Sequence, residues 1–194
     1  MTGATASLDA AAYLVESNVQ LTVAALAKDA IFVHAGVVGW RNRAIVIPAP
    51  SFSGKSTLVV ALVEAGAIYY SDEYAIFDSQ GRVHPYRRHP KLRLPSGCKA
   101  VGGLSRSVVS DDSPDPIQLG LILMTRYEMG SRWTPERLTR GESLLGLLGN
   151  TVPVRERPEQ SMQFLSKAVE SAEGFASPRS EASSVAKQIL DLLQ

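Results

Sequence analysis

The chain of 194 residues is long enough for a domain with a substantial core, and its 45% hydrophobic and 20% charged residues are ordinary for a globular protein. The 20 Lys and Arg against 19 Asp and Glu leave a net charge of +1, which gives no global field favouring a nucleic-acid partner. The single cysteine excludes an internal disulfide framework, and no apolar run approaches the roughly 18 residues of a membrane span. We therefore expect a cytoplasmic protein with no membrane partner.

The N-terminal part of the chain predicts one helix. Residues 1–7 are small and polar, and we expect them to be frayed. The alanine-rich segment Leu8–Lys28 has apolar positions at helical spacing, which favours an amphipathic helix. These apolar positions include Leu14, Val15, Val19 and Val23.

Two apolar segments follow, Ala30–Val38 and Ala44–Ile47, and both are typical of buried strands. The turn Gly39–Arg43 between them is short enough for a β-hairpin. An antiparallel hairpin at this point predicts a mixed sheet rather than a purely parallel one.

The second strand leads into a phosphate-binding pattern. A turn of small residues is followed by a predicted helix Lys55–Ala65, which Gly66 ends. Strand, turn and helix in this order are the context in which G-x-x-x-x-G-K-[S/T] indicates nucleotide binding. The residues expected to bind ATP are Ala49, Pro50, Ser51, Phe52, Ser53, Gly54, Lys55, Ser56 and Thr57.

The chemistry of this segment suits a triphosphate. Unpaired N–H groups and the positive dipole end at the start of a helix form an anion site. Lys55 can reach the β- and γ-phosphates, and the Ser56 hydroxyl can bind Mg²⁺. The pattern departs at its first glycine, which is Ala49, and Pro50 has no N–H to donate. A chance Gly-Lys-Ser-Thr at a helix start is the alternative, and the flanking apolar patterns disfavour it.

An acidic pair follows the next predicted strand, Ala67–Tyr70. If this strand is parallel to Ala44–Ile47, Asp72 and Glu73 lie at the same sheet edge as the loop, about 10 Å away even with one strand between. Asp72 is then the leading candidate for binding the metal and accepting a proton. A solvated polar strand end is the alternative interpretation.

The middle of the chain is locally basic. Tyr74–Phe77 continues the apolar pattern, and a turn follows at 78–81. No acidic residue occurs from Ser79 to Ser110. The basic residues there are Arg82, Arg87, Arg88, Lys91, Arg93, Lys99 and Arg106. A solvated face is the commoner outcome for such a run, and a surface for phosphates or an acidic substrate is the alternative. Residues 100–116 are the best candidate for a loop or lid.

The C-terminal part predicts a strand and three helices, with 139–194 packed on the same domain so that 1–194 is one unit. Ile117–Met124 is the strand, and Thr139–Glu142 is a capping box ahead of the helix Ser143–Leu148. Pro158 begins a second helix, which runs to about Ala172. Ser177-Pro178 is predicted to begin the third. The core-facing side chains of this third helix are Val185, Ile189, Leu190 and Leu193.

Three of these segments together resemble the catalytic domain of HPr kinase/phosphorylase in order and spacing. They are Val33-His34-Ala35-Gly36, Gly54-Lys55-Ser56 and Ser71-Asp72-Glu73. The resemblance covers about residues 30–95, with weaker similarity through 139–150 to the last helix. It implies an α/β domain in which helices flank a mixed sheet, the P-loop fold shared with phosphoenolpyruvate carboxykinase.

The same resemblance implies roles for individual residues. His34 would lie near the acidic pair, and Asp72 or Glu73 would serve as base and metal partner. A strand histidine taken alone is more typical of a core position. The chain has Asp-Glu where the family has two aspartates, and we find no counterpart of its later arginine–glycine signature. The resembling kinases form hexamers, so a homo-oligomer is one expectation.

These observations predict an ATP-dependent kinase that phosphorylates a hydroxyl with Mg²⁺, in which Lys55 holds the triphosphate and Asp72 accepts the hydroxyl proton. The alternative is a nucleotide-binding regulatory module or a degenerate kinase. A nucleic-acid binder fits poorly, because Tyr86 alone is not an aromatic-rich element. The sequence does not choose between a protein, a peptide and a small-molecule acceptor, or between ATP and GTP.

Overall fold

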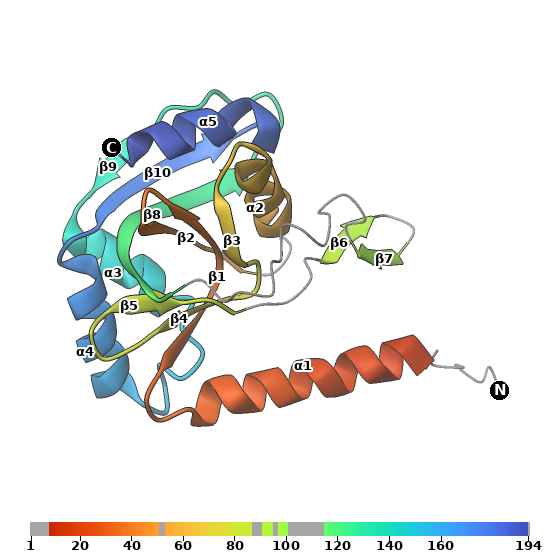
Figure 1. The fold of residues 1–194 in the computed structure, drawn as a ribbon, viewed down its shortest axis with the longest axis vertical. Coiled ribbons are helices and arrows are strands. Elements are labelled where there is room, and N and C mark those ends of the chain that lie inside the picture. Colours follow the sequence, from red (N-terminus) through yellow and green to blue (C-terminus); the bar gives the residue numbers. More distant parts are fainter. Residues whose placement is uncertain (1–7, 51–52, 87–90, 95–96, 101–114, 194) are drawn as a thin grey trace.

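The fold is a mixed β-sheet flanked by helices (Figure 1). The computed structural model describes the backbone of residues 8–50, 53–86, 91–94, 97–100 and 115–193, and the side chains of 14–50, 53–86 and 115–193. The helices of the described residues are α1 (Leu8–Leu26), α2 (Lys55–Glu64), α3 (Arg140–Leu148), α4 (Pro158–Val169) and α5 (Ala182–Leu192). Their strands are β1 (Ile31–Trp40), β2 (Arg43–Pro48), β3 (Ile68–Ser71), β4 (Tyr74–Phe77), β5 (Arg82–His84), β6 (Lys91–Leu94), β7 (Gly97–Ala100), β8 (Ile117–Tyr127), β9 (Glu136–Leu138) and β10 (Glu173–Arg179).

The predicted hairpin is confirmed. β1 and β2 pair antiparallel from Ala35↔Pro48 to Trp40↔Arg43. Their turn is shorter than the expected Gly39–Arg43, because only Arg41 and Asn42 lie outside the strands. Both have positive φ, 49° and 60°. That geometry matches the twist of the flanking strands in a two-residue hairpin.

The strand pairings make the sheet mixed and partly closed. β2, β8 and β10 are parallel neighbours, whereas β1 is antiparallel to β2, β3 and β4. β5 pairs with both β4 and β8, which closes a ring of the strands β2, β1, β4, β5 and β8. Buried side chains from these strands, among them Val33, Val46, Phe77 and Leu119, form one core cluster with α3 and α4.

The helices α2 and α5 pack on the other side of the sheet, where a second core cluster includes Ile47, Leu58 and Ile189. Gly36 of β1 allows α2 to come close, because a Cβ there would lie 2.6 Å from Cγ2 of Val59. The start of α2 lies near the same glycine, since the added Cβ would be 3.9 Å from Cβ of Lys55.

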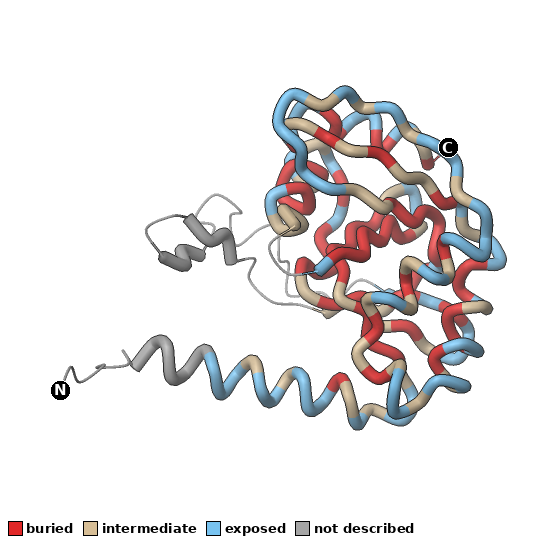
Figure 2. The backbone as a smooth tube through the Cα atoms, turned by 180° about the vertical axis from the view of Figure 1, so that it is seen from behind, coloured by how far each residue is buried: buried red, intermediate tan, exposed pale blue. Residues whose placement is uncertain are grey.

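The helix α1 was predicted correctly as an element, but most of the larger apolar side chains described in it, from Leu14 onward, lie outside the core. Figures 1 and 2 show it extending away from the rest of the chain. Ala24 near its end is buried, and Arg157 and Gln160 donate hydrogen bonds to carbonyls at that end. The apolar positions named above, Leu14, Val15, Val19 and Val23, are exposed.

The C-terminal prediction was partly wrong. Ser177-Pro178 lies in the strand β10, and the last helix begins at Ala182. The Ser-Pro pair resembles a helix start, but the parallel pairing with β8 holds this segment extended, and Pro178 lies beyond the stretch that pairs with β9. α4 ends at Val169 rather than near Ala172, and β8 continues past Met124 to Tyr127.

The predicted capping box is confirmed. Thr139 Oγ1 accepts a hydrogen bond from the Glu142 N–H at 3.2 Å, and the Glu142 carboxylate accepts one from the Thr139 N–H at 2.8 Å. The two bonds satisfy donors at the start of α3 that would otherwise be unpaired.

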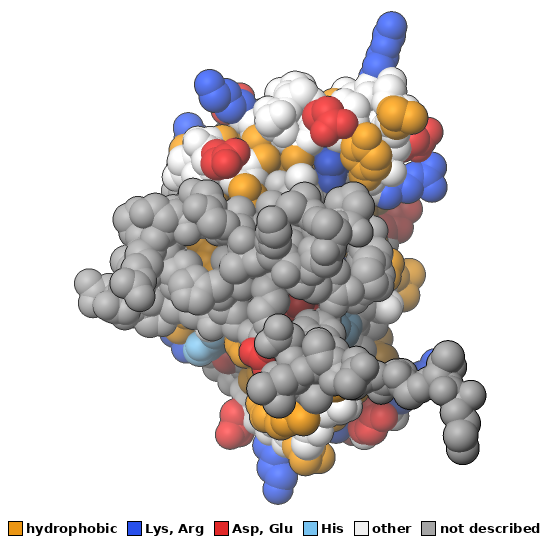
Figure 3. All heavy atoms as spheres, turned by 90° about the vertical axis from the view of Figure 1, so that its right-hand side faces the viewer, with side chains coloured by type: hydrophobic (Ala, Val, Ile, Leu, Met, Phe, Trp, Pro, Cys, Tyr) orange, Lys and Arg blue, Asp and Glu red, His pale blue; other side chains and the backbone are white. Residues whose placement is uncertain are grey.

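Several predictions fall outside the described residues. These are the frayed N-terminus 1–7, most of the predicted loop 100–116, and the side chains of Arg87, Arg88, Lys91, Arg93, Lys99 and Arg106. None of the helices in the described part of the chain is long and apolar enough to span a bilayer. Figure 3 shows the right-hand side of Figure 1 face-on. Acidic, basic and apolar side chains are interspersed over the upper part of this face.

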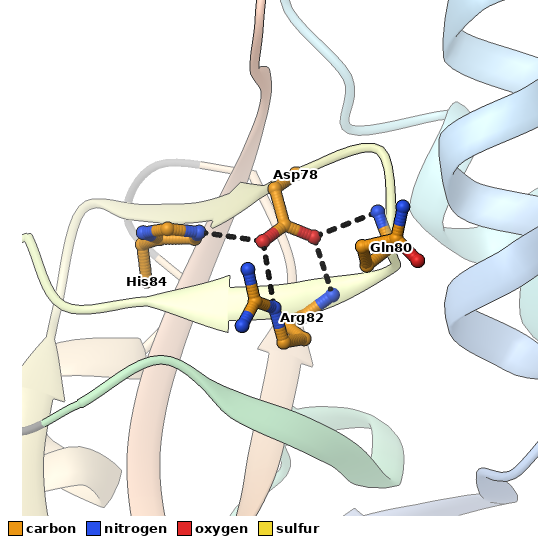
Figure 4. A network of polar contacts seen from close by, with 4 residues as sticks. All are labelled: Asp78, Gln80, Arg82 and His84. Atoms are coloured by element: carbon orange, nitrogen blue, oxygen red, sulfur yellow. Dashed lines mark hydrogen bonds and ion pairs between the residues drawn. The ribbon is translucent and has the colours of Figure 1, made fainter.

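The turn between β4 and β5 is held by one carboxylate (Figure 4). Asp78 accepts hydrogen bonds from the N–H groups of Gln80 and Arg82, at 2.9 and 3.0 Å, and its other oxygen contacts Arg82 Nε and His84 Nε2, both at 2.9 Å. Burial raises the pKa of Asp78, but the bonds from His84, Arg82 and Gln80 together outweigh it, so the pKa lies below its ordinary value.

We expect Asp78→Asn to lower the free energy of unfolding at pH 7 by about 1 kcal/mol, the usual contribution of one such hydrogen bond. Because the folded-state pKa is lowered, this contribution is present above the unfolded-state pKa of about 3.9 and is lost as the pH falls through the folded-state value. Urea unfolding at pH 7 and at acidic pH measures the difference in the free energy of unfolding between wild type and variant. Asp191→Asn, at an exposed position, is the control. If the loss of unfolding free energy in Asp78→Asn does not become smaller in acid, the stabilising role of the Asp78 carboxylate is contradicted.

Candidate functional site

The pairing of β1 places the predicted loop and the acidic pair at one edge of the sheet. β3 is antiparallel to β1, and so is β2, so β2 and β3 run in the same direction with β1 between them. The Ala49 N–H donates to the His34 carbonyl at 3.2 Å on one side of β1. The Ala35 N–H donates to the Glu73 carbonyl at 3.1 Å on the other. The strand before Asp72 therefore runs parallel to β2, as the prediction of a role for Asp72 required.

The start of α2 has the features of an anion site. Gly54 is the residue before the helix, with a φ of +84° that glycine adopts without strain. No side chain caps this end, and the first turn contains no acidic residue. The hydroxyl of Ser53 is buried and has no hydrogen-bond partner among the described residues. Ser56 is half-buried and Thr57 exposed, while Ser51 and Phe52 lie outside the described residues.

Lys55 lies between the loop and the acidic pair. Its Nζ donates to the carbonyls of Ala49 and Pro50, both at 2.8 Å. Burial lowers the pKa of Lys55, and the charges of Glu73 and Asp72 counteract only part of that effect. Both carboxylates are thus within electrostatic reach of the ammonium group, although they come from a different element of the fold.

The acidic pair occupies the break between β3 and β4. Ser71 Oγ accepts hydrogen bonds from the N–H groups of Glu73 and Tyr74, at 3.1 and 3.0 Å, which bends the chain there. Asp72 is only 9% exposed, and its Oδ1 accepts a hydrogen bond from the buried Tyr69 hydroxyl at 3.0 Å. Tyr69 therefore fixes the orientation of this carboxylate, a role that the sequence analysis did not identify.

His34 lies where the resemblance placed it, beside the acidic pair. Its ring is 4.7 Å from the ring of Tyr74. Burial is the main cause that lowers the pKa of His34, the charge of Lys55 lowers it further, and a hydrogen bond with the Glu73 backbone opposes them. The imidazole is accordingly neutral at pH 7 and carries one donor and one acceptor nitrogen.

A second cation lies beside the loop and was missed by the sequence analysis. Arg179, at the end of β10, is 2% exposed, and its Nη2 donates to the Gly54 carbonyl at 2.9 Å. The residues around it were read as a helix start, so nothing in the sequence pattern pointed to this contact. It became visible only through the pairing of β10 with β8.

The donor set at this edge is compatible with Mg²⁺. No group of three or more His, Cys, Asp or Glu that could hold a metal is found among the described residues. Mg²⁺ in phosphate sites needs only one or two protein carboxylates, because phosphates and water complete its shell. Ser56 and Asp72 could supply the hydroxyl and carboxylate oxygens for such an ion.

No protein-family model and no curated protein matches the sequence. Among solved structures, the HPr(Ser) kinase/phosphatase from Coxiella burnetii is similar, with a TM-score of 0.41 and 13% identity over 83% of this chain and 92% of that chain. The likeness does not show the family.

Replacement of Gly54 by Ala tests the geometry of the loop. A Cβ there would lie 2.8 Å from Arg179 Nη2, and the positive φ adds strain. Gly130→Ala is the matched control, since Gly130 has a φ of +76° and nothing within 4 Å of the added Cβ. We expect Gly130→Ala to lower the free energy of unfolding by about 1 kcal/mol and Gly54→Ala by roughly 1–3 kcal/mol more. Equal losses in urea unfolding would show that the contact with Arg179 is not tight.

Proposed function

We propose that this protein binds ATP at the start of α2 and transfers its γ-phosphoryl group to a hydroxyl. The observation that carries the proposal is the position of Lys55, at a helix N-terminus with its Nζ on the loop carbonyls and within electrostatic reach of Asp72 and Glu73. A cation at the positive end of a helix is unfavourable by itself. A triphosphate bound there removes that cost, and the carboxylates then lie on the side where its terminal phosphate is expected.

Binding uses groups that the loop already presents. The N–H groups of the first turn of α2 and the hydroxyl of Ser53 donate to phosphate oxygens. Lys55 leaves the carbonyls of Ala49 and Pro50 and turns to the β- and γ-phosphates. Ser56 and one carboxylate of the acidic pair, Asp72 or Glu73, would hold Mg²⁺, which would neutralise charge on the triphosphate.

The transfer step requires positioning more than a strong base. The acceptor oxygen forms a bond to the γ-phosphorus as the bond to the β–γ bridging oxygen breaks, and ADP leaves. Asp72, oriented by Tyr69, takes the proton of the hydroxyl, and Glu73 and His34 flank it as further polar groups. The transition state is loose, so an ordinary carboxylate suffices. The acceptor is a hydroxyl of a protein, a peptide or a small molecule, and a homo-oligomer is compatible with this proposal.

A nucleotide-binding regulatory module is the second candidate. Pro50 lacks the N–H that a phosphate loop would donate, and Lys55 is bonded to the loop's own carbonyls. Both features favour a protein that senses a nucleotide without turning it over quickly. Tight ATP binding with only slow hydrolysis, in the presence of candidate acceptors and with Asp72 intact, would favour the module.

Replacement of Lys55 by Ala tests both candidates. We expect a thermal shift with Mg²⁺ and ATP for the wild type, since a ligand at about 100 times its Kd adds about 2.7 kcal/mol to stability. Lys55→Ala should lose most of that shift and all ATP turnover, because the charge facing the β- and γ-phosphates is gone. Lys187→Ala, on the exposed side of α5, is the charge-matched control. Normal turnover by Lys55→Ala would rule out the mechanism.

Replacement of Tyr69 by Phe tests the orientation of Asp72. The change removes the 3.0 Å hydrogen bond to Oδ1 and keeps the ring. We expect about a tenfold fall in kcat with little change in KM for ATP, because a loss of roughly 1.4 kcal/mol falls on the transfer step. Tyr70→Phe is the control on the same strand, since the Tyr70 hydroxyl donates to the Asp115 carbonyl instead, at 2.9 Å. A similar kcat loss in both variants would indicate a general effect of the strand.

A further inference from the structure

Arg179 is a buried cation without a close negative partner. It is 2% exposed, and no carboxylate of the described residues forms an ion pair with it. Its guanidinium donates to the carbonyls of Gly54 and Ser180, at 2.9 and 3.1 Å, and its Nε is buried without a partner among the described residues. Glu181 contributes only a longer-range attraction, and its carboxylate accepts a hydrogen bond from the Tyr127 hydroxyl at 3.0 Å.

The surroundings make this charge costly. Burying an ion without a counter-ion is unfavourable, and burial accordingly lowers the pKa of Arg179. The guanidinium also lies against the residue that precedes α2, whose N-terminus carries a partial positive charge, and Lys55 follows directly. Two sources of positive potential, the guanidinium and the N-terminus of α2, thus lie close together, an arrangement that an anion bound there would stabilise.

The contact with Gly54 also fixes a peptide plane. In a planar trans peptide the carbonyl of one residue and the N–H of the next point in opposite directions. With the Gly54 carbonyl held toward Arg179, the Lys55 N–H must point away from it. The Gly54 carbonyl also accepts the first hydrogen bond of α2, from the Leu58 N–H at 3.1 Å, so the helix and Arg179 hold the same peptide from two directions.

We propose that Arg179 is a positioning residue that, together with the Leu58 N–H, holds the Gly54–Lys55 peptide so that the Lys55 N–H faces the phosphate groups of a bound nucleotide, to which the guanidinium adds its charge. The inference rests on the proposed function, because it needs a phosphate ligand at the start of α2. It adds a residue from the far end of the chain, on β10, to the recognition of the triphosphate.

The test compares Arg179→Met, Arg179→Lys and Arg137→Met with the wild type in calorimetric titrations with Mg·ATP and with inorganic triphosphate. Arg137 is the matched control, since its guanidinium lies 5.8 Å from the Phe175 ring, as that of Arg179 lies 5.9 Å from the Tyr127 ring. It is exposed and paired with Glu173. We expect Arg179→Met to weaken both ligands about tenfold or more, as for the loss of a charged group, and Arg137→Met to change affinity less than about twofold.

A spectroscopic measurement separates positioning from a general loss of structure. In the wild type the Lys55 amide resonance should shift when inorganic triphosphate is added, and in folded Arg179→Met this shift should be much reduced. Arg179→Lys keeps the charge but not the two-pronged donor, so we expect about a threefold or greater loss of affinity. If Arg179→Met does not fold, the affinity of Arg179→Lys and its Lys55 amide shift test the role of Arg179 instead.

The outcomes distinguish the two proposals. Wild-type affinity and an unchanged Lys55 shift in folded Arg179→Met, or in Arg179→Lys where only that variant folds, would overturn the role of Arg179 and leave the proposed function standing. A wild-type protein that binds neither ATP nor inorganic triphosphate would overturn the proposed function and this inference with it.

Discussion

The arrangement of the site depends on the hydrogen bonding of one strand, β1, with neighbours on both sides. Its antiparallel pairing with β2 carries the loop to the sheet edge at Ala49, and its antiparallel pairing with β3 and β4 carries Asp72 and Glu73 to the same edge. A slip of one residue in either register would turn every side chain of the affected strand to the opposite face. The buried apolar side chains of β1, such as Val33 and Val37, make such a slip costly, so the core fixes the geometry of the site.

The electrostatics of the site run against stability. Lys55 and Arg179 are both desolvated, and both lie at the N-terminal end of α2, where a carboxylate would be the stabilising choice. Proteins that break a local rule of this kind usually do so at a functional site, where a ligand supplies the missing interaction. Tyr69 adds a related feature, since it holds one carboxylate in a fixed, largely buried position rather than leaving it in solvent.

Much of the first half of the fold could be predicted, because local patterns decide it. The hairpin, the helix that begins at Lys55 and the strand before Asp72 each follow from apolar runs with turn residues between them. β10 could not be predicted in the same way: Glu173–Arg179 has no clear alternation, and its Ser-Pro pair is a common helix start, so only the pairing with β8 decides its conformation. For the same reason Arg179 could not be predicted as part of the site, whereas Lys55 and Asp72 could, since their positions follow from neighbouring segments of sequence. The roles of these residues stay predictions.

The ring formed by β2, β1, β4, β5 and β8 has a consequence for how copies of the protein can meet. Each strand of the ring has a neighbour on either side, so its backbone groups are largely engaged within one molecule. Among the described strands of this sheet, the outer positions fall to β3 and the three-residue β9. Short outer strands are poor templates for intermolecular β-pairing. The larger sheet therefore leaves few backbone groups for extending it from one molecule into the next.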